Sequence, residues 1–183
     1  MNIKYLIDKL CYVFMSPEKY ARHVGVNMGQ NNEIYTKRFV SSEPYLIAIG
    51  SHCQITEGVK IFTHGGPGAV RWKHPMFDCF GKVQIGDYVY LGNYSMIMPG
   101  VTIGNHVIVA AGSVVTKSVP SDVVIGGNPA RILCGLDEYI EKNLTYNLNS
   151  KGLSSKKKKV LLCNLPENKF IKKDCLEGHN NEK

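Results

Sequence analysis

The sequence lacks a hydrophobic run long enough to cross a bilayer. Near the N-terminus the longest apolar run is Leu10–Met15, whereas a membrane helix needs about 20 apolar residues. No small-residue cleavage site follows this run, so we predict neither a membrane span nor a signal peptide. The six cysteines include no C-x-x-C pair, so we expect reduced thiols in a cytoplasmic protein, without a metal site.

A basic arm is also absent, although the formal net charge is +7. Residues 1–135 carry 12 basic and 8 acidic side chains, and residues 136–183 carry 10 and 7. Lys156–Lys159 is the one long basic run, and no aromatic residue interleaves with it, as base stacking would require. We therefore expect a solvated helix start there and no nucleic-acid partner.

What the sequence does contain is a repeat of six residues, broken by one gap and one slip of three residues. Its aliphatic anchors are Met28, Ile34, Val40, Ile49, Ile55, Ile61, Ile85, Leu91, Ile97, Ile103, Val109 and Val115. Small or β-branched residues stand four positions after the later anchors: Val89, Ser95, Val101, Val107, Ser113 and Val119. A period of six fits neither a helix, which needs a spacing near 3.6, nor an alternating strand.

One anchor in six residues indicates short strands joined by tight corners, where Gly and Asn let the backbone turn. Three such faces make a triangular coil, and stacked coils bury one continuous core. The predicted fold class is therefore mainly β, a parallel β-helix of hexapeptide repeats.

Helical patterns flank the repeat. Apolar residues at helical spacing predict a helix over residues 2–15, and Ser16 is placed to cap a second one, with Pro17 in its first turn. After Pro129 the coil is expected to stop.

Beyond this point Leu136, Tyr139, Ile140 and Leu144 predict a helix, and Ser154 or Ser155 is placed to cap another. The last ten or so residues are expected to be disordered. We divide the chain into a helical segment (1–24), a β-helix domain (25–135) with a loop at 64–82, and a helical extension (136–183).

The loop at 64–82 interrupts the repeat with a glycine-rich stretch. It holds His64, His74 and the only tryptophan, Trp72. A loop inserted into a solenoid that stays in frame on both sides projects outward, and such loops carry binding and catalytic residues. We expect function to concentrate here.

Several motifs resemble those of the hexapeptide-repeat acyltransferases, above all the maltose, galactoside and other sugar O-acetyltransferases. They are I-G-D-Y-V-Y, L-G-N-Y-S-M, I-M-P-G-V-T, A-G-S-V-V-T-K, G-G-N-P-A-R and F-T-H-G-G. The resemblance implies a left-handed β-helix and an acetyl-CoA-dependent O-acetyltransferase that forms a homotrimer with composite sites. It implies a sugar or polysaccharide precursor as acceptor, by analogy alone.

The resemblance also assigns a general base. In this family a histidine at the end of a coil deprotonates the acceptor hydroxyl, and His64 occupies that place. Imidazole, with an ordinary pKa of about 6.5, is neutral near pH 7 and can still accept a proton. Many relatives read T-H-D-G, but Gly65 stands here instead of the acid. Glu43 is the candidate to take over that acid's role in orienting the base or holding substrate.

Further residues carry over to the coenzyme and the acceptor. Asn93, at a coil corner, is expected to support the oxyanion or the pantetheine arm. Ala111, Thr116 and Lys117 match the stretch that lines the coenzyme cleft, with Lys117 meeting phosphate as a point charge. Arg131 is a candidate either for a second phosphate contact or for bracing the chain where it leaves the coil. Trp72 and Arg71 are expected at a loop tip near the acceptor or the adjacent subunit. His52 and His74 are expected to be structural, and His106 to be an exposed, inert turn residue.

Other functions remain open. An antibiotic acetyltransferase, of the kind that acts on streptogramins, and an amino-sugar N-acetyltransferase would use the same base. A γ-type carbonic anhydrase would need three histidines converging on zinc, and His64 and His106 lack the close pairing for it. A non-catalytic scaffold would need neither His64 nor Lys117.

Overall fold

The structure is a computed structural model that describes residues 3–175. Residue 2 and most of the predicted disordered tail lie outside this range. The chain divides into two compact units, Met1–Asp137 and Glu138–Lys183.

The first unit is built from short strands that stack into three sheets, here named A, B and C. Sheet A contains β1 (Asn27–Met28), β3 (Ile47–Ile49), β6 (Val83–Ile85) and β9 (Thr102–Ile103). Sheet B contains β2 (Glu33–Ile34), β4 (Gln54–Ile55), β7 (Tyr90–Leu91), β10 (Ile108–Val109), β12 (Val123–Gly127) and β13 (Ala130–Gly135). Sheet C contains β5 (Lys60–Ile61), β8 (Met96–Ile97) and β11 (Val114–Val115).

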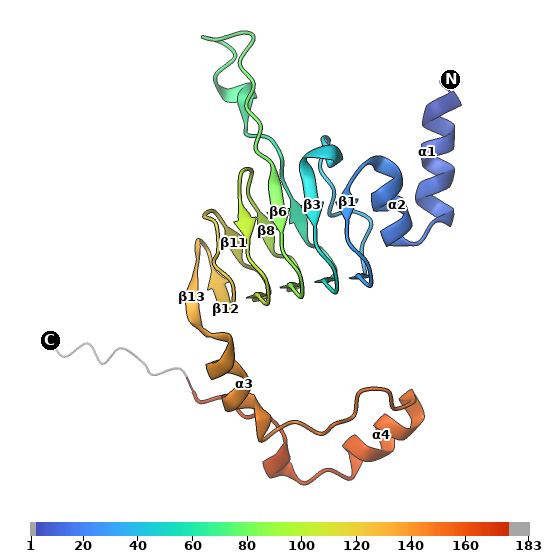
Figure 1. Cartoon of the computed structure of the whole chain (residues 1–183), viewed down its shortest axis with the longest axis vertical. Coiled ribbons are helices and arrows are strands. Elements are labelled where there is room, and N and C mark those ends of the chain that lie inside the picture. The colour runs from blue at the N-terminus through green and yellow to red at the C-terminus, as the bar shows by residue number, and fades with distance from the viewer. Residues whose placement is uncertain (1–2, 176–183) are drawn as a thin grey trace, which may run out of the picture. The chain divides into compact units, whose positions relative to one another are not determined.

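The chain visits sheets A, B and C in turn, and each coil adds a parallel strand beside the strand of the coil before (Figure 1). Ile85 pairs with Ile49 in sheet A, and one coil later Ile103 pairs with Ile85. This is the left-handed β-helix of hexapeptide repeats that the sequence predicts. The loop between β5 and β6 projects away from the stack.

The coil ends in an antiparallel hairpin of β12 and β13. The two strands are joined through a cis peptide bond between Asn128 and Pro129. The sequence predicts that the coil stops after Pro129, whereas β13 adds one more strand to sheet B. The repeat gives no signal for it, because the six-residue step from Val115 reaches Ser121, which is not aliphatic.

The predicted anchors form the core. All are buried except Ile34 and Val40, which are partly buried and pack against the others. Ser95 and Ser113, two of the small residues four positions after an anchor, are fully buried. Burying one large aliphatic side chain stabilises a fold by about 1.5–3 kcal/mol, so the stacked anchors are the main source of stability.

Polar corner residues tie the coils together where sheet A turns into sheet B. Asp87 Oδ1 accepts a hydrogen bond from the Ser51 amide at 2.6 Å, and Asn105 Oδ1 accepts one from the Asp87 amide at 2.8 Å. Ser121 Oγ repeats the contact with the Asn105 amide at 2.9 Å. Each coil thus satisfies a corner N–H of the coil before it.

The residue after each of these polar corner residues has a left-handed backbone, and the rings of three such residues stack on one another. The rings of His52 and Tyr88 are parallel, with centroids 4.6 Å apart, and His106 lies 5.4 Å beyond Tyr88. His106 Nδ1 lies 3.1 Å from Asp122. His52 and His106 are therefore members of a corner ladder, which fits the structural role predicted for His52, and His106 is exposed on a turn, as predicted.

Two helices precede the coil, as predicted. They are α1 (Ile3–Phe14) and α2 (Pro17–Val24). Ser16 caps α2, and its hydroxyl accepts a hydrogen bond from the Lys19 amide at 3.4 Å.

After the coil come α3 (Leu136–Leu144), α4 (Ser155–Cys163) and the 3₁₀ turn η3 (Glu167–Lys169). Ser154 caps α4, and Lys156–Lys159 are exposed in its first turns, as the sequence predicts. Between residues 3 and 175, no helix combines the length and the apolar character that a membrane crossing requires.

Candidate active site

The turn from sheet C to sheet A, here called the C–A corner, is where the coils differ most. In the first coil it contains Ser41 to Leu46, including the 3₁₀ turn η1 (Pro44–Leu46). In the second it expands into residues 62–82, with the 3₁₀ turn η2 (Pro67–Ala69). The predicted three-residue slip and the predicted loop therefore fall on neighbouring levels of one edge of the coil.

The two levels bring Glu43 and His64 together. Glu43 directly precedes η1, and His64 follows β5 by three residues. Glu43 Oε2 lies 2.9 Å from Nδ1 of His64. The carboxylate side chain is 17% exposed and the imidazole 36%, so the pair lies at the surface with the acid on the inner side.

The charge state of Glu43 determines which ring nitrogen of His64 carries the proton. A hydrogen bond from Thr63, followed by one from His64, holds the pKa of the Glu43 carboxyl below its ordinary value. A carboxylate can only accept hydrogen bonds, so Nδ1 of His64 must donate. Nε2 is then left with its lone pair, as a proton acceptor requires.

Two hydroxyl groups stand behind the carboxylate. Thr63 Oγ1 donates to Glu43 Oε2 at 2.6 Å, and Ser41 Oγ lies 2.8 Å from Thr63 Oγ1. Thr63 has no exposed surface. Neither residue is predicted from the sequence, where the one available signal is that Thr63 directly precedes the histidine.

A short backbone clamp fixes the base of the loop. The Gly81 amide donates to the Thr63 carbonyl at 2.8 Å, and the Gly65 amide donates to the Cys79 carbonyl at 3.1 Å. Between them His64 and Phe80 form an antiparallel bridge, with their rings edge to face at 6.4 Å. The backbone of His64 is therefore held from both sides.

The exposed Cys79 thiol lies close to the backbone of Gly65. A Cβ added at Gly65 would lie 2.8 Å from the Cys79 sulfur, closer than real Cβ contacts come. An aspartate at this position, as in T-H-D-G, would have to displace that thiol. The acid next to His64 comes instead from Glu43, one coil earlier.

The outer part of the loop does not reach His64. Trp72 is 82% exposed, Met76 is 94% exposed, and Arg71 pairs with Asp78 at 3.6 Å. The predicted acceptor residue Trp72 therefore stands at an open loop tip within one chain.

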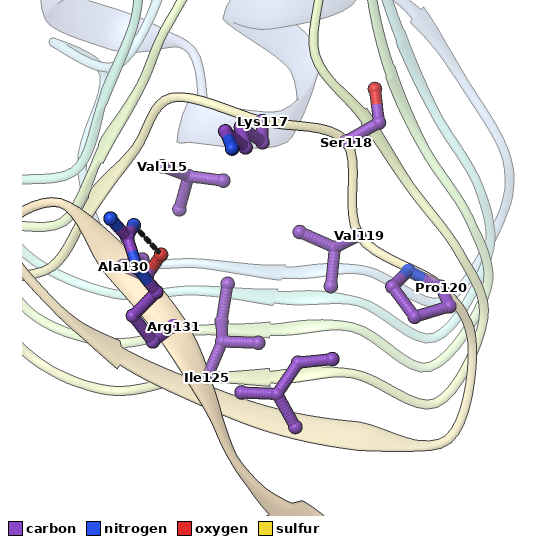
Figure 2. A pocket seen from close by; sticks show the side chains of 9 residues that line it. Val115, Lys117, Ser118, Val119, Pro120, Ile125, Ala130 and Arg131 are labelled. Carbon is purple, nitrogen blue, oxygen red and sulfur yellow. Dashed lines mark hydrogen bonds between the residues drawn. The ribbon is translucent and has the colours of Figure 1, made fainter.

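A pocket of about 350 Å³ lies along the same edge, at the end of the coil. Val115, Val119 and Ile125 point into it, with Lys117 and Arg131 at its margin (Figure 2). The rest of its lining is Ser118, Pro120, Ala130 and Ile132. The structure thus brings together the two cations that the sequence assigns to coenzyme phosphate.

The pocket lies two coils from His64 on the C–A corner. Strands of successive coils are about 4.8 Å apart, so two steps separate the His64 and Lys117 corners by about 10 Å. An apolar pocket with two cations beside it fits an extended thioester ligand that ends in phosphates.

Asn93 and Ala111 lie elsewhere. Both are exposed on the turn from sheet B to sheet C, where the Gly112 amide donates to the Asn93 carbonyl at 2.8 Å. Thr116 is exposed and begins the C–A corner that contains Lys117. The face of sheet C therefore separates Asn93 and Ala111 from His64 within one chain.

The described residues form neither a disulfide nor a cluster of metal ligands. All six cysteines fall inside the described range and are free, and burial raises the pKa of the Cys53 thiol. Residues 3–175 contain no group of three or more His, Cys, Asp or Glu side chains arranged to hold a metal ion.

The sequence is similar to a family of transferases and to several named proteins. A family model described as bacterial transferase hexapeptide (six repeats) matches residues 82–117. Protein CapG of Staphylococcus aureus is 44% identical over 172 residues, which cover 92% of this chain and 99% of the relative. Galactoside O-acetyltransferase of Escherichia coli (strain K12) is 32% identical over 113 residues, 61% of this chain and 52% of that enzyme.

Solved structures agree with these matches. A maltose O-acetyltransferase from Clostridium difficile 630 has 27% identity and a TM-score of 0.54, over 65% of this chain and 74% of that chain. A hexapeptide-repeat acetyltransferase from Vibrio cholerae O1 biovar eltor, complexed with acetyl coenzyme A, has 26% identity and a TM-score of 0.55. That match covers 70% of this chain and 82% of the other.

Proposed function

This chain belongs to the hexapeptide-repeat transferase family, as an acetyltransferase that uses acetyl-CoA, and from that premise we propose that it acetylates a hydroxyl of a sugar or polysaccharide precursor with His64 as general base. The observation that carries the proposal is the 2.9 Å contact between Glu43 Oε2 and His64 Nδ1. It supplies what the T-H-G-G sequence leaves out, an acid that orients the ring.

In this mechanism Nε2 of His64 takes the proton of the acceptor hydroxyl while its oxygen forms a bond to the acetyl carbon. As the carbon–sulfur bond breaks, the imidazolium returns that proton to the departing sulfur. Glu43 remains a carboxylate and stabilises the charged ring between these two transfers. A general base of this kind contributes roughly 10²–10⁴ in rate.

Lys117 and Arg131 supply the binding energy for the other end of acetyl-CoA. Their charges suit phosphate groups, and the apolar lining between them suits the alkyl part of the arm. Binding by these remote groups would hold the thioester in register with His64 without touching the reacting atoms.

A panel of acceptors tests the reaction class. With acetyl-CoA present, we expect free thiol to be released with neutral sugars and nucleotide sugars, and the product to carry an ester that mild alkali removes. The measurement is thiol release followed by mass spectrometry of the product. Transfer only to amino-sugars or to antibiotics, giving an alkali-stable amide or a modified antibiotic, would favour the alternatives over sugar O-acetylation.

A second part of the proposal is a homotrimer with composite sites. Asn93 and Ala111 lie on one edge of sheet C, and His64 and Lys117 lie on the other. One chain cannot bring these edges together, but a cyclic arrangement places one edge of each copy beside the other edge of its neighbour.

Mixing two inactive variants tests this arrangement. We expect His64→Ala and Asn93→Ala each to be strongly impaired alone, because one lacks the base and the other an oxyanion donor. In co-refolded random trimers about a quarter of the interfaces combine an intact His64 with an intact Asn93, so about a quarter of wild-type turnover should return.

The control is a mixture of the two variants purified separately, which should stay inactive while subunits do not exchange. No recovery in the co-refolded sample, or a monomer by light scattering at micromolar concentration, would contradict shared sites.

A further inference from the structure

The contacts of Glu43 suggest how its carboxylate is held in place beside His64, and the inference drawn from them rests on the proposed function. We propose that Thr63 is a positioning residue: its hydroxyl, backed by Ser41, holds the Glu43 carboxylate in the one orientation that keeps the His64 proton on Nδ1.

The contacts form a single chain of groups. Thr63 Oγ1 and His64 Nδ1 both meet the same carboxylate oxygen, Glu43 Oε2, at 2.6 and 2.9 Å. Because Thr63 has only one hydroxyl proton and Glu43 can only accept, that proton goes to Glu43. The Thr63 oxygen then accepts from Ser41 at 2.8 Å. The neighbours of each group therefore determine whether it donates or accepts its hydrogen bond.

Glu43 needs such support, because it is a long side chain and follows directly on an exposed residue, Ser42. A glutamate loses rotamer freedom when it is fixed, so one contact to a partly exposed imidazole holds it weakly. Thr63 is stiffer, since its β-branched side chain is limited at χ1. It is fully buried, and its carbonyl is fixed by the Gly81 amide at the loop base.

The same residue therefore joins the loop clamp to the acid. Thr63 contacts Gly81 through its backbone and Glu43 through its side chain, and it is covalently bonded to His64. If the loop base moved, the Thr63 hydroxyl and the His64 imidazole would move together, so their positions relative to each other would be preserved.

The test is a double-mutant cycle on turnover. Thr63→Val keeps the shape of the side chain and removes the hydroxyl, and we expect kcat to fall about tenfold with the KM for acetyl-CoA unchanged, since a hydrogen bond to a charged group is lost. Thr63→Ser should restore most of the rate. In a Glu43→Ala background the same Thr63→Val change should alter kcat by less than about twofold, because its target is already gone.

Thr56→Val is the matched control. Thr56 is also buried in the coil, and its hydroxyl donates to the Leu91 carbonyl at 2.7 Å, on the turn from sheet B to sheet C and not on the C–A corner that holds His64. We expect it to lower thermal stability as Thr63→Val does but to leave kcat unchanged.

The outcomes separate the two claims when His64→Ala is measured in the same series. If His64→Ala is inactive but Thr63→Val keeps full kcat, or loses as much in the Glu43→Ala background, Thr63 is merely structural and the inference fails alone. If His64→Ala turns over normally, the base is elsewhere and both claims fail.

Discussion

Replacement of His64 by alanine should lower kcat at least about a hundredfold, the lower end of what a general base contributes. The acceptor hydroxyl would then have no imidazole nearby to take its proton, and Glu43 is a weaker base whose pKa the remaining hydrogen bond from Thr63 still lowers. Binding of acetyl-CoA should be unchanged, since Lys117 and Arg131 are two coils away. Thiol release at saturating substrates measures the first effect, and calorimetric titration measures the second.

A histidine from the corner ladder provides the control. His106 is exposed and pairs with Asp122 at 3.1 Å, on the turn from sheet A to sheet B. His106→Ala should leave kcat within about twofold, as surface changes usually have small effects. Equal losses in the two variants would mean that histidine removal acts through the fold and not through proton transfer.

The Lys117→Gln and Arg131→Gln changes should each weaken acetyl-CoA binding about tenfold, because each removes a charge-assisted contact worth roughly 1.5–3 kcal/mol. The loss should fall on Kd and KM, with kcat at saturation preserved, since neither residue touches the reacting atoms. Calorimetry with acetyl-CoA and with a coenzyme that lacks the 3′-phosphate would show whether the variants have lost discrimination between the two.

Lys19→Gln removes one positive charge at the other end of the coil, on α2, and controls for the change in net charge. It should bind acetyl-CoA as the unchanged protein does. Unaltered Kd in both Lys117→Gln and Arg131→Gln would contradict the assignment of this pocket to the coenzyme.

The coil could be predicted in detail because its energetics are local and repeated. One aliphatic side chain every six residues must face the interior of a three-sided coil, and ten of the twelve predicted anchors are buried there. The two partly buried anchors, Ile34 and Val40, lie in the first coil, whose third anchor, Met28, is buried. The hairpin strand β13 was missed because it pairs antiparallel and follows no six-residue step.

The candidate site was predictable only in pieces. The loop drew attention to His64, and the absence of an acid after it made Glu43 the candidate replacement. Their contact depends on two inserts that stack on neighbouring coils, 21 residues apart in the chain, which spacing alone does not reveal. Ser41 and Thr63 were overlooked because small hydroxyl residues in a coil also serve packing. Asn93 shows the opposite case. Its motif made it a candidate, but the structure has it on the far edge of sheet C, which a single chain cannot bring to His64.

The central claim is that His64, oriented by Glu43, removes the proton as the acetyl group moves, and a single-turnover experiment tests it most directly. Enzyme preloaded with acetyl-CoA would be mixed with the acceptor identified from the panel, and formation of acetylated product would be followed in wild type and His64→Ala. We predict that the variant transfers its bound acetyl group at least about a hundredfold more slowly. Transfer at the wild-type rate from the loaded variant would show that another group performs this step.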